Sequence, residues 1–322
     1  MKLGVFTVLY GRLPFEEALD KLAGLGVEAV EIGTGNYPGD AHCKPDELLG
    51  DQDRARRFLK AVESRGMVIS ALSQHGNPLH PQEERARKDH NTWRKTVQLA
   101  EALEVPVVNA FSGCPGDGEG SRFPNWVTCP WPEDFLEILD WQWNQKVIPY
   151  WTEQAAFATD HGVKIGFEMH PGFVVYNPET LLRLREACGE AVGANLDPSH
   201  LFWQGIDATE AIRELGTAGA IFHMHAKDTW VDPHNTRRNG VLDTKHYERL
   251  LDRSWVFRTV GYGQGEKVWR DIVSALRAVG YDYVLSIEHE DGYMSIDEGL
   301  RKGIELLQAI LLKEQPAEMW WA

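Results

Sequence analysis

The sequence predicts an α/β fold of one domain, a (β/α)8 TIM barrel with long loops after its fourth and seventh strands. Three observations support this fold class. Eight short β-type runs alternate with amphipathic helical stretches along the 322 residues. No Gly-rich GxGxxG loop follows the first run, as a doubly wound sheet would favour, and no linker divides the chain. We therefore expect a closed parallel barrel over 1–313 and a tail over 314–322.

The eight expected strands are short runs of β-forming residues. In chain order they cover 3–10, 28–35, 67–76, 105–113, 164–171, 192–200, 220–228 and 283–291. Between them, helices are expected near 46–66, 82–103, 133–160, 178–188, 207–216 and 266–279. Another helix is expected after the first strand, opening at Pro14 because proline favours the first helical position, and ending near Gly24 and Gly26. The last helix follows Ser295, whose spacing from Glu298 is that of a capping box.

Two of the expected loops are long, and both leave the carboxyl ends of strands, where barrels of this type carry their active sites. They cover 112–131 and 229–264. Loops of this length inside a compact domain form lids or binding loops, or they are disordered. Tryptophans in both loops argue against disorder. They are Trp126 and Trp131 in the first loop, and Trp230 and Trp255 in the second.

The composition excludes several classes of protein. The net charge of −15 disfavours nucleic-acid binding, which depends on Lys and Arg neutralising phosphates. The four cysteines form no CxxC pair, which is typical of a reduced, cytoplasmic protein and not of a disulfide framework or a thiolate zinc site. No run of about 18 apolar residues is present, so no membrane span is expected.

Polar residues interrupt four successive strands at a similar place. Glu168, Asp197 and Glu288 lie near the ends of the fifth, sixth and eighth strands, and the seventh contains both His223 and His225. Strands of a barrel are buried on both faces, so charges there are costly unless something offsets them. One divalent ion, Mn²⁺, Mg²⁺, Co²⁺ or Zn²⁺, suits three carboxylates and one imidazole. Spacing alone does not choose between the two histidines, because residues two apart on a strand face the same side.

At these positions the sequence resembles the xylose isomerase-like barrels, a sugar isomerase/epimerase superfamily that includes inosose dehydratase, ketose 3-epimerases and endonuclease IV. The resemblance covers nearly the whole chain. It is carried by VEAVEIG (27–33), FEMHP (167–171), NLDPSH (195–200), HMHAKD (223–228) and SIEHED (286–291). It implies that Glu168, Asp197, His225 and Glu288 are the metal ligands, and it selects His225 because the histidine of H-x-K-D is the ligand in similar enzymes.

Further residues are expected around these ligands. His200 lies three residues after Asp197, where similar enzymes use a histidine to contact substrate or metal, so it is a candidate catalytic group beside Glu168 and Glu288. Glu31 and His223 are expected to support the ligands from behind. Residues near the same rim are expected to contact substrate, and they are His75, Asn109, Trp131, His170, Lys227, Asp228 and Arg258.

The resemblance implies a sugar or polyol substrate and two reactions. The first is isomerisation or epimerisation, in which a carboxylate takes the proton next to a carbonyl and the metal stabilises an enediolate. The alternative is a dehydratase or a lyase that cleaves a 3-keto-glycoside with the same site, using His200 or His170 as the acid. Cleavage of abasic DNA, as in endonuclease IV, is opposed by the −15 charge, and a binding barrel without turnover is opposed by the intact ligand set.

The tail gives one further expectation. It ends in EMWWA, and its apolar residues Met319, Trp320 and Trp321 suggest either an anchor on a second copy, making a homo-oligomer, or a floppy segment.

Overall fold

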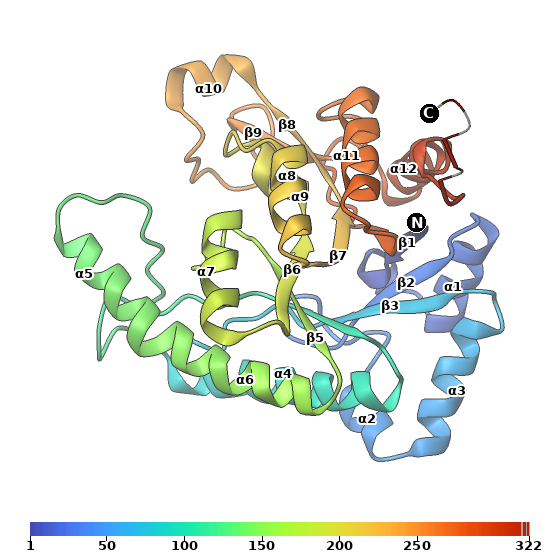
Figure 1. The fold of residues 1–322 in the computed structure, drawn as a ribbon, viewed down its shortest axis with the longest axis horizontal. Coiled ribbons are helices and arrows are strands. Elements are labelled where there is room, and N and C mark those ends of the chain that lie inside the picture. Colours follow the sequence, from blue (N-terminus) through green and yellow to red (C-terminus); the bar gives the residue numbers. More distant parts are fainter. Residues whose placement is uncertain (317, 320, 322) are drawn as a thin grey trace.

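The computed structural model describes residues 1–316, 318, 319 and 321. Within these residues eight parallel strands close into a barrel in the order β1-β10-β7-β6-β5-β4-β3-β2, which confirms the predicted fold class (Figure 1). The strands are β1 (Lys2–Phe6), β2 (Ala29–Gly33), β3 (Val68–Ser73), β4 (Val107–Ala110), β5 (Lys164–Glu168), β6 (Val192–Leu196), β7 (Ile221–Ala226) and β10 (Val284–Ile287). Pairing between β1 and β10 closes the barrel, with Gly4 opposite Ser286.

Helices pack around the barrel in chain order. They are α1 (Phe15–Gly24), α2 (Pro45–Leu49), α3 (Gln52–Glu63), α4 (Glu83–Ala102), α5 (Asp134–Trp141), α6 (Ile148–Asp160), α7 (Pro178–Cys188), α8 (Pro198–Phe202), α9 (Ala208–Thr217), α10 (Pro233–Asn239), α11 (Glu266–Ala278) and α12 (Ile296–Ile310). A 3₁₀ turn, η1 (Thr7–Tyr10), follows β1, and a π-helical segment, η2 (Gln142–Val147), joins α5 to α6.

Capping residues explain several helix boundaries. The expected helix at 46–66 divides into α2 and α3 because Asp51 caps a new helix, its side chain accepting from the backbone N–H of Arg54. Ser295 caps α12 by accepting from Glu298 N–H at 3.3 Å, as the spacing predicts. Pro14 lies one position earlier than expected, at the N-cap of α1.

The long segment after β7 is an ordered excursion from the barrel. Strands β8 (Asp228–Val231) and β9 (Trp255–Arg258) pair antiparallel, and α10 lies between them at the edge of the molecule (Figure 1). We call residues 228–264 the hairpin excursion. Stacking of Trp255 on Trp203, with ring centroids 4.7 Å apart, packs it against α8. This segment, expected as a lid or binding loop, therefore contains regular elements that contact the barrel.

One buried carboxylate fixes both ends of the hairpin excursion. Asp228 accepts hydrogen bonds from the backbone N–H groups of Gly261, Gly263 and Gln264, and from the Trp269 indole at 2.9 Å. The chain therefore leaves and rejoins the barrel at one point. Among the described residues, no helix is both long and apolar enough to span a membrane.

Candidate metal centre

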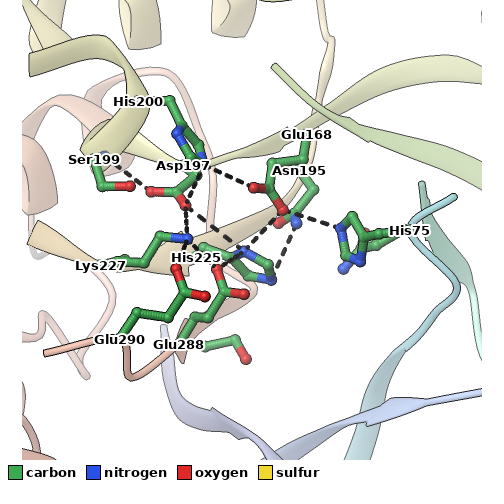
Figure 2. Close-up of polar contacts among 12 residues, drawn as sticks. His75, Glu168, Asn195, Asp197, Ser199, His200, His225, Lys227, Glu288 and Glu290 are labelled. Atoms are coloured by element: carbon green, nitrogen blue, oxygen red, sulfur yellow. Dashed lines mark hydrogen bonds and ion pairs between the residues drawn. The ribbon is translucent and has the colours of Figure 1, made fainter. Parts of the chain in front are cut away.

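The four predicted ligands meet at one point at the carboxyl ends of their strands. Glu168 ends β5, Asp197 follows β6, His225 lies in β7 and Glu288 follows β10. One ligand atom from each lies within 4.8 Å of the corresponding atom of every other (Figure 2). Glu168, Asp197 and His225 are buried, while the Glu288 side chain keeps 14% of its surface exposed. Carboxylates gathered this closely favour a bound cation.

The orientation of His225 fits a metal ligand. Its Nε2 lies 2.9 and 3.0 Å from the two carboxylate oxygens of Glu31. Because a carboxylate only accepts hydrogen bonds, Nε2 carries the proton in a neutral ring and Nδ1 carries the lone pair. Nδ1 lies 3.0 Å from Glu288 Oε2 and 3.3 Å from Glu168 Oε2. Burial would lower the pKa of His225, but Glu31 and Glu288 raise it well above its usual value, so the ring carries a proton on Nδ1 as well when no metal is bound. A divalent ion at this point would take the place of that proton.

Asp197 is oriented by the helix that it begins. Its side chain caps α8 by accepting from the backbone N–H of Ser199 at 2.9 Å, and Pro198 occupies the first turn. This capping bond uses Oδ1. Oδ2 is buried, lies 3.0 Å from Lys227 Nζ and faces the other ligands. The D-P-S sequence therefore directs one carboxylate oxygen away from the helix and toward the centre.

His223 lies deeper in the barrel and is held on both sides by protein groups. Its Nδ1 is 3.0 Å from Asn195 Oδ1, and its Nε2 is 3.1 Å from Ser70 Oγ. Burial lowers the pKa of His223 to about 4, so the ring is neutral near pH 7. The hydrogen bonds thus distinguish the two histidines that spacing left open, and they favour His225 as the ligand.

Two cations balance the carboxylates of the centre. Lys227 Nζ lies 2.7 Å from Glu288 Oε2 and 3.0 Å from Asp197 Oδ2 (Figure 2). Burial alone would lower the pKa of Lys227, but these carboxylates raise it well above its usual value. Burial likewise would raise the pKa of Glu288, but the charges of Lys227 and His225 hold it at about 2. Glu288 is therefore ionised and available as a ligand.

Histidines hold the other side of the centre. His200 Nε2 lies 2.9 Å from Glu168 Oε1, and His75 Nε2 lies 3.0 Å from Glu168 Oε2. The ring of His170 lies 4.1 Å from that of His200, centroid to centroid. Burial would raise the pKa of Glu168, but His75 and His200 keep it well below its usual value.

A cavity of about 700 Å³ opens above the centre. Five of the predicted residues line it, and they are Glu168, Glu288, His75, His170 and Lys227. Asn109 lies beneath, where its amide donates to Glu31 at 3.0 Å, and Asp228 fixes the hairpin excursion. Two other predicted substrate contacts do not line the cavity. Arg258 pairs with Asp291, and Trp131 is 74% exposed.

Sequence reasoning missed much of the cavity wall. Glu290 lines the cavity and lies 3.1 Å from Lys227 Nζ, and its place two residues after Glu288 was the available signal. Aromatic residues from two strands and several loops complete the wall, and no sequence pattern connected them to the ligands. They are Phe6, Tyr37, Phe111, Phe173, Tyr247 and Phe257.

Comparisons with known proteins agree with this architecture. A family model described as xylose isomerase-like TIM barrel matches residues 19–310. The protein YfiH of Bacillus subtilis (strain 168) is 40% identical over 311 residues, which are 96% of this chain and 98% of YfiH. Among solved structures, a D-tagatose 3-epimerase-like protein superposes with a TM-score of 0.63 at 20% identity, covering 96% of this chain and 98% of that one. The IolI protein with a bound zinc atom superposes with a TM-score of 0.64 at 19% identity, covering 98% and 100%. At these identities the two structures show a shared fold.

Proposed function

Because the chain belongs to the xylose isomerase-like TIM barrel family, we propose that it is a divalent-metal-dependent sugar isomerase or epimerase. The observation that carries the proposal is the convergence of Glu168, Asp197, Glu288 and the Nδ1 of His225 on one point. These four residues would hold the ion, which is Mn²⁺, Mg²⁺, Co²⁺ or Zn²⁺. When bound, it would supply Lewis-acid polarisation of a substrate carbonyl.

The proton transfer falls to the two carboxylates that reach the cavity. Glu168 and Glu288 line the cavity, whereas Asp197 is fully buried. In the barrel, β5 and β10 are separated by β6 and β7, so these two carboxylates approach a bound carbon chain from different sides. One takes the proton next to the carbonyl. Return of the proton to the opposite face of that carbon gives an epimer, and return to the neighbouring carbon gives an isomer.

Neighbouring side chains position both carboxylates for this task. His200 holds Glu168 Oε1 and Lys227 holds Glu288 Oε2, which fixes the orientation of each carboxylate before substrate arrives. Aromatic rings around the cavity exclude water and offer apolar surfaces for a sugar ring.

The position of His170 suggests a second candidate function, elimination. His170 lines the cavity beside His200, and burial lowers its pKa to about 3, so it would protonate a departing oxygen with a proton that it first receives from the carboxylate that deprotonated the substrate. The first step would be the same proton removal, and the second would release water or an aglycone. This is the reaction of a dehydratase or a 3-keto-glycoside lyase.

Proton exchange with heavy water tests the proposal and separates the two reactions. Protein loaded with Mn²⁺ is incubated in D₂O with keto-sugars, aldo-sugars and 3-keto-glycosides, and products are followed by NMR. Metal-dependent exchange of the proton next to the carbonyl, with a new stereoisomer or isomer, is the expected result. Release of water or aglycone would assign elimination instead. If no member of the panel shows metal-dependent exchange, both proposed reactions are contradicted.

Three sequence-based expectations stay part of the proposal. The first is a small sugar or polyol substrate and no nucleic-acid partner. The second is a cytoplasmic location, and the third is a homo-oligomer that forms through the tail. Met319 is 64% exposed, while Trp320 lies outside the described residues. Light scattering on the purified chain tests the assembly.

A further inference from the structure

The cavity has a second region that a lone sugar does not explain. Its volume of about 700 Å³ lies in the range of roughly 300–1,000 Å³ that holds drug-sized ligands, which are larger than a free pentose or hexose. The polar groups gather at the floor, around the metal centre. One wall comes from the hairpin excursion and is apolar. It consists of Tyr247, Leu250, Val256 and Phe257, which we call the hairpin wall.

We propose that the hairpin wall is a binding subsite for an aromatic group attached to the sugar, so that the substrate is an aryl glycoside of a keto-sugar, with its carbonyl on a ring carbon other than the one that bears the aryl group. The sugar end of this assignment rests on the proposed function, since it places the reacting carbonyl at Glu168 and Glu288. The aromatic end rests on the hairpin wall alone.

The hairpin wall is a preformed surface. Tyr247 and Phe257 stack with ring centroids 5.8 Å apart and an angle of 19° between their planes. Behind them, the guanidinium of Arg253 lies 4.4 Å from the Tyr247 ring centroid and 4.5 Å from that of Trp255. Arg253 is only 2% exposed. A surface held in place from behind loses little freedom when it binds a ligand, which favours affinity.

Exposure of the hairpin wall points to an absent partner. Tyr247 is 51% exposed although it is stacked on Phe257 and covers Arg253. A second stacked pair, Phe111 and Phe173, lines the same cavity with ring centroids 4.3 Å apart. A sugar held at the metal centre would leave the rim of the hairpin wall in water. An aromatic ring bound there would remove that apolar surface from water.

The charges of the cavity exclude a phosphate at this position. Lys227 is the single lysine or arginine among the described residues that line the cavity, and three carboxylates already surround its Nζ. Glu290, which is half-exposed, adds negative charge to the same lining. A phosphoryl group would therefore be repelled by these carboxylates and would find no unpaired cation in the lining. An uncharged aromatic ring would not be repelled.

Matched ligands test the subsite by binding alone. Phenyl and methyl β-glycosides of glucose, galactose and xylose are titrated into the metal-loaded protein by isothermal calorimetry. We expect the phenyl glycoside to bind at least about tenfold more tightly, the size of one buried aromatic contact. Tyr247→Ala should reduce this ratio to about one. Leu242→Ala is the matched control, because Leu242 lies in the same excursion, is 65% exposed and does not line the cavity.

The possible outcomes separate this proposal from the proposed function. Equal binding of phenyl and methyl glycosides, or a preference that survives Tyr247→Ala, overturns the subsite. A change of oligomeric state in Tyr247→Ala would make the hairpin wall a subunit contact and also overturn it. A phenyl preference without any metal-dependent proton exchange supports the subsite and contradicts the proposed function. Exchange with free keto-sugars but no phenyl preference supports the proposed function and contradicts the subsite.

Discussion

Substitution of Glu31 by Gln is expected to weaken metal binding although Glu31 is not a ligand. The Glu31 carboxylate is fully buried and accepts hydrogen bonds from donors on every side. Those donors are His225 Nε2, Asn109 Nδ2, Ser73 Oγ and Ser286 Oγ. Gln brings an NH₂ group into this set of donors. Where that NH₂ faces His225, the imidazole proton must move from Nε2 to Nδ1, and it then covers the lone pair directed at the metal.

The expected size of the effect follows from this change of tautomer. Loss of a hydrogen-bonding partner behind a metal-bound histidine costs about 10–100-fold in affinity, which corresponds to about 1.4–2.7 kcal/mol. The four ligand side chains themselves stay in place, because Gln has nearly the shape of Glu. Turnover measured at saturating metal should therefore fall less than the affinity does.

Calorimetric titration of Zn²⁺ and Mn²⁺ into chelator-treated protein measures the effect. Glu290→Gln is the matched control, since it removes the same charge from a half-exposed side chain that contacts Lys227 at 3.1 Å. We expect Glu290→Gln to bind metal nearly as tightly as the wild type. An affinity of Glu31→Gln within twofold of the wild type, or an equal loss in Glu290→Gln, would refute the reasoning.

Three further predictions concern turnover and stability. Glu288→Gln should lower turnover by about 10²–10⁴-fold while circular dichroism stays unchanged, and wild-type turnover in this variant would exclude the proposed base. Metal at 100 times its Kd should add about 2.7 kcal/mol to the free energy of unfolding. Removal of the metal by EDTA should therefore lower the melting temperature of the wild type by several degrees, and it should not lower that of Asp197→Asn. Asp228→Asn should cost about 1–3 kcal/mol in urea unfolding, because an amide cannot accept from all the N–H groups around Asp228; a loss below about 0.5 kcal/mol would contradict this.

The fold was predictable because buried parallel strands leave a strong pattern. Their apolar runs stand out between amphipathic helices. Seven barrel strands lie within the predicted ranges, and the remaining one, β1, begins one residue early, at Lys2. The predicted ranges run too far at their carboxyl ends. The eighth, for example, was expected to reach 291, but β10 ends at Ile287 and Glu288 follows it. Residues that turn toward a ligand leave the sheet, and sequence pattern alone does not distinguish them from the strand.

The candidate site was predictable where chemistry and strand position coincide. Glu168, Asp197 and Glu288 were identified because charges in a barrel strand need an explanation. The choice between His223 and His225 required hydrogen-bond partners, which spacing does not contain. The hairpin wall was also missed, because β8 and β9 are only four residues each and Tyr247 lies far from the ligands in sequence. Contacts of that kind arise only when the chain folds.

The common base of the hairpin excursion has a consequence for the diversification of this chain. Asp228 binds Gly261, Gly263 and Gln264 at the point of departure, so 229–260 behaves as a cassette on a fixed base. Insertions, deletions or grafts between β8 and β9 would reshape the hairpin wall at Tyr247 and Leu250 while β8, β9 and the barrel strands stay in place. Directed evolution toward new substrates would best begin by randomising this segment, and chimeras joined at Thr229 and Val260 offer a direct way to transplant selectivity.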